Sequence, residues 1–124
     1  MLPAAHRLKD GATFREAIRS GRRAGRRTLV VHLLVGGTVA GTDARIDPVP
    51  PRVGFVVSKA VGNAVIRNQV KRRLRHLARE HVSSLPGSAV LVVRALPPAA
   101  SASSRELGAD LERCLERART EVTR

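Results

Sequence analysis

Residues that could catalyse a reaction are few and scattered in this sequence. The carboxylates before residue 105 stand far apart along the chain, at Asp10, Glu16, Asp43, Asp47 and Glu80. Hydrolysis of a phosphodiester by two metal ions needs carboxylates that hold the ions about 4 Å apart. Neither a Cys and His spacing typical of a metal site nor a phosphate-binding loop of the P-loop type is present. The sequence therefore predicts neither a metal site nor a catalytic residue.

Histidine and cysteine do not change this interpretation. The four histidines have no identifiable nucleophile as a partner, and they are interpreted as structural or surface residues: His6, His32, His76 and His81. The one cysteine, Cys114, falls on an apolar helical stripe and is interpreted as a packing residue. A single cysteine excludes an internal disulfide and is compatible with a reducing compartment.

The clearest chemical pattern is a series of cations without acids between Asn63 and Val82, where Asn63 is a good helix N-cap. At 100° per residue, the apolar side of this predicted helix consists of Ile66, Val70, Leu74, Leu77 and Ala78. The opposite side consists of Asn68, Lys71, Arg72, Arg75, His76 and Arg79, with Arg67 and Arg73 at its borders. Like charges at i, i+4 destabilise a helix by about 0.2–0.5 kcal/mol per pair. The pattern therefore indicates a surface that binds phosphates rather than a merely soluble face.

The charge of the whole chain favours the same interpretation. Lys and Arg number 23 against 10 Asp and Glu, a net charge of +13. Residues 105–124 hold as many acids as cations, so the excess lies in residues 1–104, and no acid occurs in 17–42 or 48–79. All but three of the cations are Arg, which binds phosphate through two parallel hydrogen bonds and stacks on bases, although a genome rich in G and C would also favour Arg. A polyanionic partner is expected.

The remaining elements must position this helix. A capping box at Thr13–Glu16 predicts a short helix that ends at Ser20-Gly21, and residues 29–35, 52–58 and 87–95 read as strands. A second capping box at Ser103–Glu106 starts a last helix. Its apolar stripe consists of Leu107, Leu111, Cys114, Leu115, Ala118 and Val122. One domain is expected over residues 1–124, with a flexible loop at 36–51 and a frayed tail at 119–124.

No signal peptide or apolar stretch long enough to span a membrane is visible, so a cytoplasmic protein without a membrane partner is expected. Aromatic residues are only 2% of the chain, with Phe14 and Phe55 as the only ones besides histidine. Functions that need stacked aromatic side chains are therefore disfavoured.

Two neighbouring segments carry a specific resemblance. Residues 52–59 read Arg-Val-Gly-Phe-Val-Val-Ser-Lys, and residues 61–75 read Val-Gly-Asn-Ala-Val-Ile-Arg-Asn-Gln-Val-Lys-Arg-Arg-Leu-Arg. A strand ending in Ser-Lys, a Gly-Asn-Ala turn and a helix with Arg-Asn-Arg followed by Lys-Arg resemble the signature of the protein component of bacterial ribonuclease P. The resemblance covers roughly residues 6–118.

The resemblance implies a fold, a function and two binding sites. The fold would be α+β, a two-layer domain with a small mixed sheet, three helices and a left-handed crossover around the central helix. The function would be to bind the catalytic RNA and the 5′ leader of precursor tRNA, with Mg²⁺ held mainly by RNA and the cleavage carried out by RNA. The positions that match the RNA-binding helix are Arg67, Asn68, Lys71, Arg72, Arg75 and Arg79. The positions that match the cleft for the leader, between the sheet and the first helix, are Phe14, Ile18, His32, Arg52, Val56, Lys59 and Arg94.

The sequence departs from the family pattern at four positions, two of which belong to the predicted cleft. Gln69 stands where the third residue of Arg-Asn-Arg is basic, and Ala60 stands where a second Lys is common. Ile18 and His32 replace aromatic residues that are usual in the cleft, which shifts the expected leader contacts from base stacking toward the backbone.

Two alternative functions fit the charge. A ribosomal protein could contact rRNA by the same basic helix, but it would not explain the arrangement of the Ser-Lys, Gly-Asn-Ala and Arg-Asn motifs. A helix-turn-helix DNA reader is less consistent, because the basic helix follows a strand rather than a helix and a short turn.

Overall fold

The computed structural model describes residues 11–34, 51–82, 85 and 89–122, with side chains as far as Ala118. The elements along the chain are α1 (Gly11–Ser20), β1 (Arg22–Gly25), β2 (Leu29–Leu34), β3 (Arg52–Val56), α2 (Ala64–Arg79), β4 (Val90–Ala95), the 3-10 helix η3 (Pro97–Ala100) and α3 (Ser104–Val122). The predicted α+β class is confirmed, with one four-stranded mixed sheet and three α-helices. Apart from Pro51, the predicted loop 36–51 lies outside the described residues, as do residues 123–124 of the predicted tail.

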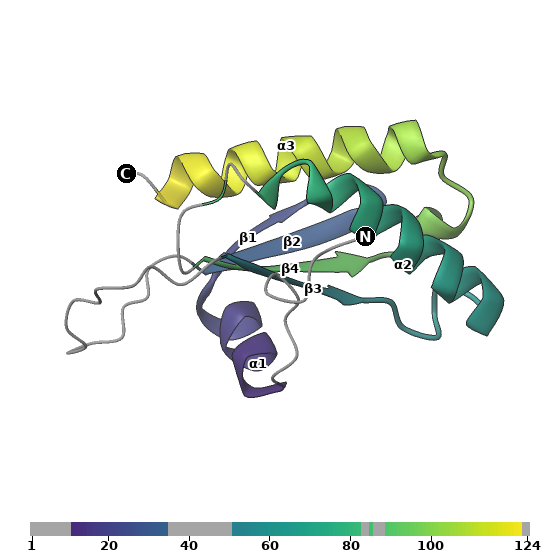
Figure 1. The fold of residues 1–124 in the computed structure, drawn as a ribbon, viewed down its shortest axis with the longest axis horizontal. Helices are drawn as coiled ribbons and strands as arrows, with labels where there is room; N and C mark the ends of the chain where they lie inside the picture. Colours follow the sequence, from purple (N-terminus) through teal and green to yellow (C-terminus); the bar gives the residue numbers. More distant parts are fainter. Residues whose placement is uncertain (1–10, 35–50, 83–84, 86–88, 123–124) are drawn as a thin grey trace.

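The sheet has the strand order β1-β2-β4-β3. β2 pairs antiparallel with both β1 and β4, whereas β3 pairs parallel with β4. α2 forms the crossover between the parallel strands β3 and β4. The helices lie on both sides of the sheet, with α1 below it and α2 and α3 above it in the view of Figure 1.

Two separate apolar clusters follow from this arrangement. The larger one fills the space between the sheet and the helices α2 and α3, and the fully buried leucines are Leu29, Leu33, Leu74, Leu91, Leu107, Leu111 and Leu115. The smaller one lies between α1 and the sheet, with Ala17, Val90 and Val92 buried and Phe14, Leu34 and Val56 packed around them. Since helices cover both faces, the central strands β2 and β4 are nearly continuous apolar runs.

The start of α2 follows the prediction closely. The side-chain Oδ1 of Asn63 accepts a hydrogen bond from the backbone N–H of Ile66 at 3.0 Å, so Asn63 is the N-cap. Gly62 precedes it because a Cβ at this position would lie 2.9 Å from the Cγ2 of Ile66. The predicted apolar side also faces the larger cluster. The predicted end at Val82 is wrong: α2 ends at Arg79, and Val82 reaches the core from a tighter turn.

The N-terminal part of the chain differs more from the prediction. α1 already begins at Gly11, so Thr13 lies inside the helix and is not its cap. The predicted end is confirmed, because the Gly21 N–H donates to the Ala17 carbonyl at 2.9 Å. Residues 22–25 form the edge strand β1, which the run of arginines did not suggest. The backbone is a strand here because it pairs with β2, not because its side chains favour one.

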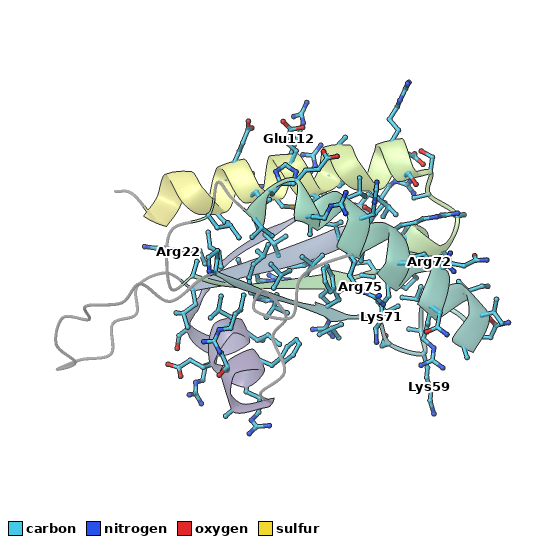
Figure 2. All side chains as sticks on the ribbon, viewed as in Figure 1. Arg22, Lys59, Lys71, Arg72, Arg75 and Glu112 are labelled. Atoms are coloured by element: carbon cyan, nitrogen blue, oxygen red, sulfur yellow. The ribbon has the colours of Figure 1, made fainter. Side chains whose placement is uncertain are left out.

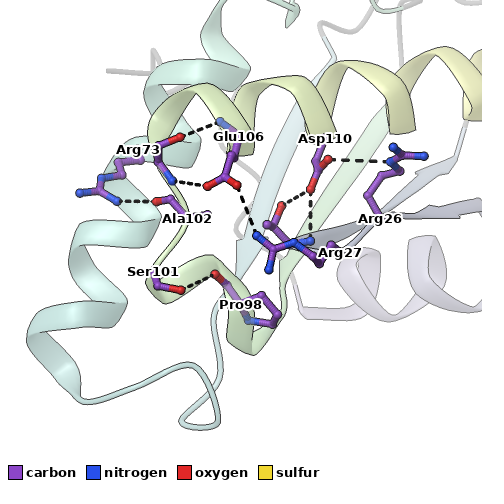
Figure 3. A network of polar contacts seen from close by, with 10 residues as sticks. Arg26, Arg27, Arg73, Pro98, Ser101, Ala102, Glu106 and Asp110 are labelled. Carbon is purple, nitrogen blue, oxygen red and sulfur yellow. Dashed lines mark hydrogen bonds and ion pairs between the residues drawn. The ribbon is translucent and has the colours of Figure 1, made fainter.

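A polar network anchors the turn between β1 and β2 to α3 (Figure 3). The carboxylate of Asp110 accepts hydrogen bonds from the Thr28 hydroxyl at 2.6 Å and the Thr28 N–H at 3.2 Å, and it pairs with Arg26 at 3.8 Å. One turn earlier, the predicted capping box is confirmed: Glu106 N–H donates to Ser103 Oγ at 3.0 Å, and Ser103 N–H donates to Glu106 Oε1 at 2.9 Å. The acids near the start of α3 are therefore engaged in holding the fold together.

Candidate nucleic-acid interface

The outer surface of α2 carries the residues predicted to bind RNA. We call this surface the basic face, and it consists of Arg67, Asn68, Lys71, Arg72, Arg75 and Arg79. Asn68, Arg72 and Arg79 are exposed, and Arg67, Lys71 and Arg75 are half-buried. Lys71, Arg72 and Arg75 follow one another along the helix (Figure 2). The structure therefore brings together all six residues that the sequence assigned to this site.

The cations of the basic face have no acidic partner among the residues that the structure describes. Within the described part of the chain, the ion pairs Arg26–Asp110 and Arg27–Glu106 join the β1–β2 turn to α3, and no acid pairs with a cation of the basic face. Arg73 is different, because its Nη1 donates to the Ala102 carbonyl at 3.3 Å and thereby links α2 to the segment before α3. Uncompensated cations in a row are expected where phosphates supply the opposite charge.

The second predicted site lies on the opposite side of the sheet, on the surface that α1 partly covers. We call it the α1 face. Phe14 and Val56 pack around the small cluster of Ala17, Val90 and Val92. Strand alternation and register place three more predicted residues on the same surface: His32 opposite Val92, Arg52 opposite Val90, and Arg94 opposite Val56.

The other two predicted residues of this site lie at its margins. Ile18 is on α1 with 38% of its surface exposed, an unusual exposure for a large apolar side chain. Lys59 is exposed in the turn after β3, and Figure 2 shows it extending away from α3. Both are accessible to a ligand that crosses the α1 face, but neither belongs to its packed part.

Sequence reasoning missed Arg23 as a member of the α1 face. Arg23 is exposed on β1 and lies opposite His32 in the sheet register. Ala24, its neighbour in the strand, packs in the larger cluster on the other side of the sheet, so Arg23 faces the α1 side. Recognising residues 22–25 as a strand would have revealed this position through alternation.

Three nitrogen atoms in the described residues are buried and have no hydrogen-bond partner: Nδ1 of His32, Nε of Arg52 and Nε of Arg67. Leaving such an atom unpaired costs about 1–3 kcal/mol. Two of the three belong to the α1 face and the third to the basic face. Unused hydrogen-bonding capacity is therefore concentrated at the two candidate sites.

His32 is only 4% exposed, and its pKa lies below the ordinary value of 6.5 because of burial first, and then because of the nearby charges of Arg23 and Arg94. The imidazole is therefore neutral at neutral pH. A neutral ring can accept or donate a hydrogen bond but adds no charge to the surface.

The lowered pKa of His32 predicts a pH-dependent stability. Because the unfolded chain binds a proton near pH 6.5 and the folded chain only at lower pH, stability is lost as the pH falls below 6.5. We expect the free energy of unfolding in urea to decrease more for the wild type than for His32→Phe between about pH 7.5 and about pH 5.5. An equal decrease in both proteins would contradict this assignment.

No group of three or more His, Cys, Asp or Glu side chains that could hold a metal ion occurs among the described residues. Cys114 is buried, and burial first, with the charge of Asp110, raises the pKa of its thiol to about 11. No helix within the described ranges is long and apolar enough to span a bilayer. The two candidate sites thus offer cations, hydrogen bonds and apolar contacts to a ligand.

Comparison with known proteins agrees with this geometry. The family model for ribonuclease P matches residues 2–119. The ribonuclease P protein component of Nocardioides sp. (strain ATCC BAA-499 / JS614) is 79% identical over 123 residues, which cover 99% of each chain. That of Salinispora tropica is 51% identical over 128 residues and covers 96% of this chain and 94% of that protein. Neither relative is a ribosomal protein.

Solved structures agree as well. The RNase P protein of Staphylococcus aureus matches with a TM-score of 0.74 at 30% identity, over 91% of this chain and 94% of that one. The protein of Thermotoga maritima shares the fold, with a TM-score of 0.70 at 23% identity. The sequence match covers nearly the whole chain and the fold agrees with it, so the chain belongs to the ribonuclease P protein family, the protein subunits of the endoribonuclease ribonuclease P.

Proposed function

We propose that the chain docks on ribonuclease P RNA through the basic face of α2 and holds the 5′ leader of precursor tRNA on the α1 face of its sheet. The observation that carries the proposal is the row of cations on α2 that no acid of the described chain neutralises. Structured RNA supplies phosphates along such a surface, and each contact releases bound counterions.

The leader part of the proposal is supported by the α1 face. Arg52, Arg94 and Arg23 supply guanidinium groups, and Phe14 and Val56 supply apolar contact. A single-stranded leader exposes both phosphates and base faces, which this mixture can bind. Since His32 stands where the family usually has an aromatic residue, hydrogen bonds and phosphate contacts contribute more here than base stacking.

The two sites lie on opposite sides of the sheet, which gives the protein a positional task. α2 would hold the catalytic RNA while the α1 face holds the substrate, and the cations between them reduce the repulsion of two polyanions. We assign the cleavage reaction to the RNA, which would also hold most of the Mg²⁺ of the holoenzyme. This function would place the protein in the cytoplasm.

The proposal is tested by cleavage at low Mg²⁺. Adding the purified chain to ribonuclease P RNA should lower the Mg²⁺ concentration needed for half-maximal removal of the leader, because fewer metal ions are needed for screening. Cleavage is measured by gel separation of labelled precursor and product across a Mg²⁺ titration. An unchanged Mg²⁺ requirement would falsify the proposal.

A further inference from the structure

A second feature lies beside the basic face, where α2 approaches the start of α3. A cavity of about 420 Å³ is lined there by Arg72, Arg73, Arg75, His76 and Leu77 of α2 and by Ser104 of α3. Its volume is within the range of about 300–1,000 Å³ that is typical of small-ligand sites. The recognition of RNA by helix α2 does not by itself account for a hollow at this position.

The interior of the cavity is mainly apolar although three of its six lining residues are arginines. Leu77 packs against the larger core cluster, and Gly108 of α3 lies close to it, since a Cβ at 108 would be 3.3 Å from the Cδ2 of Leu77. The hydrogen bond from Arg73 to the Ala102 carbonyl fixes a second wall. Arginine stems therefore supply carbon to the interior while their guanidinium groups stay near the surface.

This combination selects among possible occupants. A free inorganic anion would not need an apolar interior, and an apolar small molecule would not need three arginines around it. A nucleotide needs both, because its base stacks on apolar surface or on guanidinium planes while its phosphate attracts cations. Arg72 and Arg75 also belong to the basic face, so the cavity opens where RNA is proposed to lie.

We propose that the cavity between α2 and the start of α3 receives one unstacked nucleotide of the RNA that docks on the basic face. The inference rests on the proposed function and adds a specific contact to a surface otherwise described by charge. Proteins commonly recognise RNA by bases splayed out of the helical stack. Neither Phe14 nor Phe55 lines the cavity, so its arginines and His76 replace aromatic rings as the stacking surface here.

The test fills the cavity without changing a charge. Ser104→Phe places a ring in it, and Ser101→Phe is the matched control, because Ser101 is exposed in the same segment but does not line the cavity. Circular dichroism and thermal melting establish that both variants are folded. We expect Ser104→Phe to bind ribonuclease P RNA about tenfold more weakly, which is the effect of losing one stacked base. The salt dependence should stay as steep as in the wild type, because no cation is lost.

Chemical probing with dimethyl sulfate, together with a carbodiimide that modifies uracil, identifies the nucleotide. One base of the RNA should be protected by the wild type and by Ser101→Phe and should react again in the complex with Ser104→Phe. If Ser104→Phe binds as tightly as the wild type, or if weaker binding is accompanied by no change at a single base, the cavity holds no nucleotide. Failure of the proposed docking on α2 would give a different result. The affinity of the wild type for ribonuclease P RNA would then not depend on the salt concentration.

Discussion

Replacing Arg67 and Arg72 together by alanine is expected to weaken binding of ribonuclease P RNA about tenfold or more and to flatten its salt dependence. Both residues belong to the basic face, and Arg67 has a buried Nε without a hydrogen-bond partner. If the wild type neutralises about six phosphates, its log–log slope is about −5 on duplex RNA, and losing two contacts makes it less steep by about 2. Filter binding across a series of salt concentrations measures both quantities.

The matched control for this experiment lies on α3. Arg113→Ala with Arg117→Ala removes the same charge from two exposed positions, on a helix that carries five acids against four arginines. It should leave the slope nearly unchanged, since these residues are outside the basic face. Equal flattening in both double variants would mean that net charge alone governs binding, and the assignment of α2 would be wrong.

The second large effect is expected at the α1 face. Arg52→Ala with Arg94→Ala should reduce the preference of the holoenzyme for precursor tRNA over mature tRNA by about tenfold or more, because charge-assisted hydrogen bonds contribute about 1.5–3 kcal/mol each. Arg52 lies opposite Val90 and Arg94 is four residues further along β4, so the two groups are about 13 Å apart along the strand. Two such contacts can hold a leader in one direction across the sheet.

Affinities of the assembled holoenzyme for the two substrates measure this effect. Mature tRNA lacks the leader, so its affinity should change little in the variant, and assembly with ribonuclease P RNA should also be retained. An equal loss for both substrates would show that Arg52 and Arg94 contact the body of the tRNA or support assembly instead.

The parts of the fold that could be predicted from the sequence are those fixed by local signals. Asn63 marks the start of α2, the reciprocal bonds of Ser103 and Glu106 start α3, and helical periodicity identifies the buried sides of both helices. The same periodicity predicted the cationic side of α2, and the resemblance to the family assigned Arg67 to the basic face. These features depend on residues within one or two turns of each other, so a single sequence contains the necessary information.

What could not be predicted depends on contacts between distant segments. β1 is a strand because β2 pairs with it, and its arginines did not indicate a strand. The position of β4 between β2 and β3 joins strands that are far apart in sequence. Arg23 and the cavity beside Leu77 become visible only after these elements are placed, because each combines residues from separate elements. The end of α2 was misjudged because Val82 stays apolar and buried after the helix has ended.

The central claim is that α2, and not α3, faces ribonuclease P RNA, and tethered cleavage measures this most directly. A hydroxyl-radical source, an iron chelate, is attached to a cysteine introduced by Gln69→Cys on α2 or by Glu112→Cys on α3, both at exposed positions. The native Cys114 should not react, because its thiol is buried and its pKa is raised to about 11. The wild type treated with the same reagent measures any background.

Glu112 points away from the sheet on the outer side of α3 (Figure 2), so the two probes sample different surfaces. We predict defined cuts in ribonuclease P RNA from position 69 and few or none from position 112. Cuts from position 112 without cuts from position 69 would contradict the docking of RNA on α2.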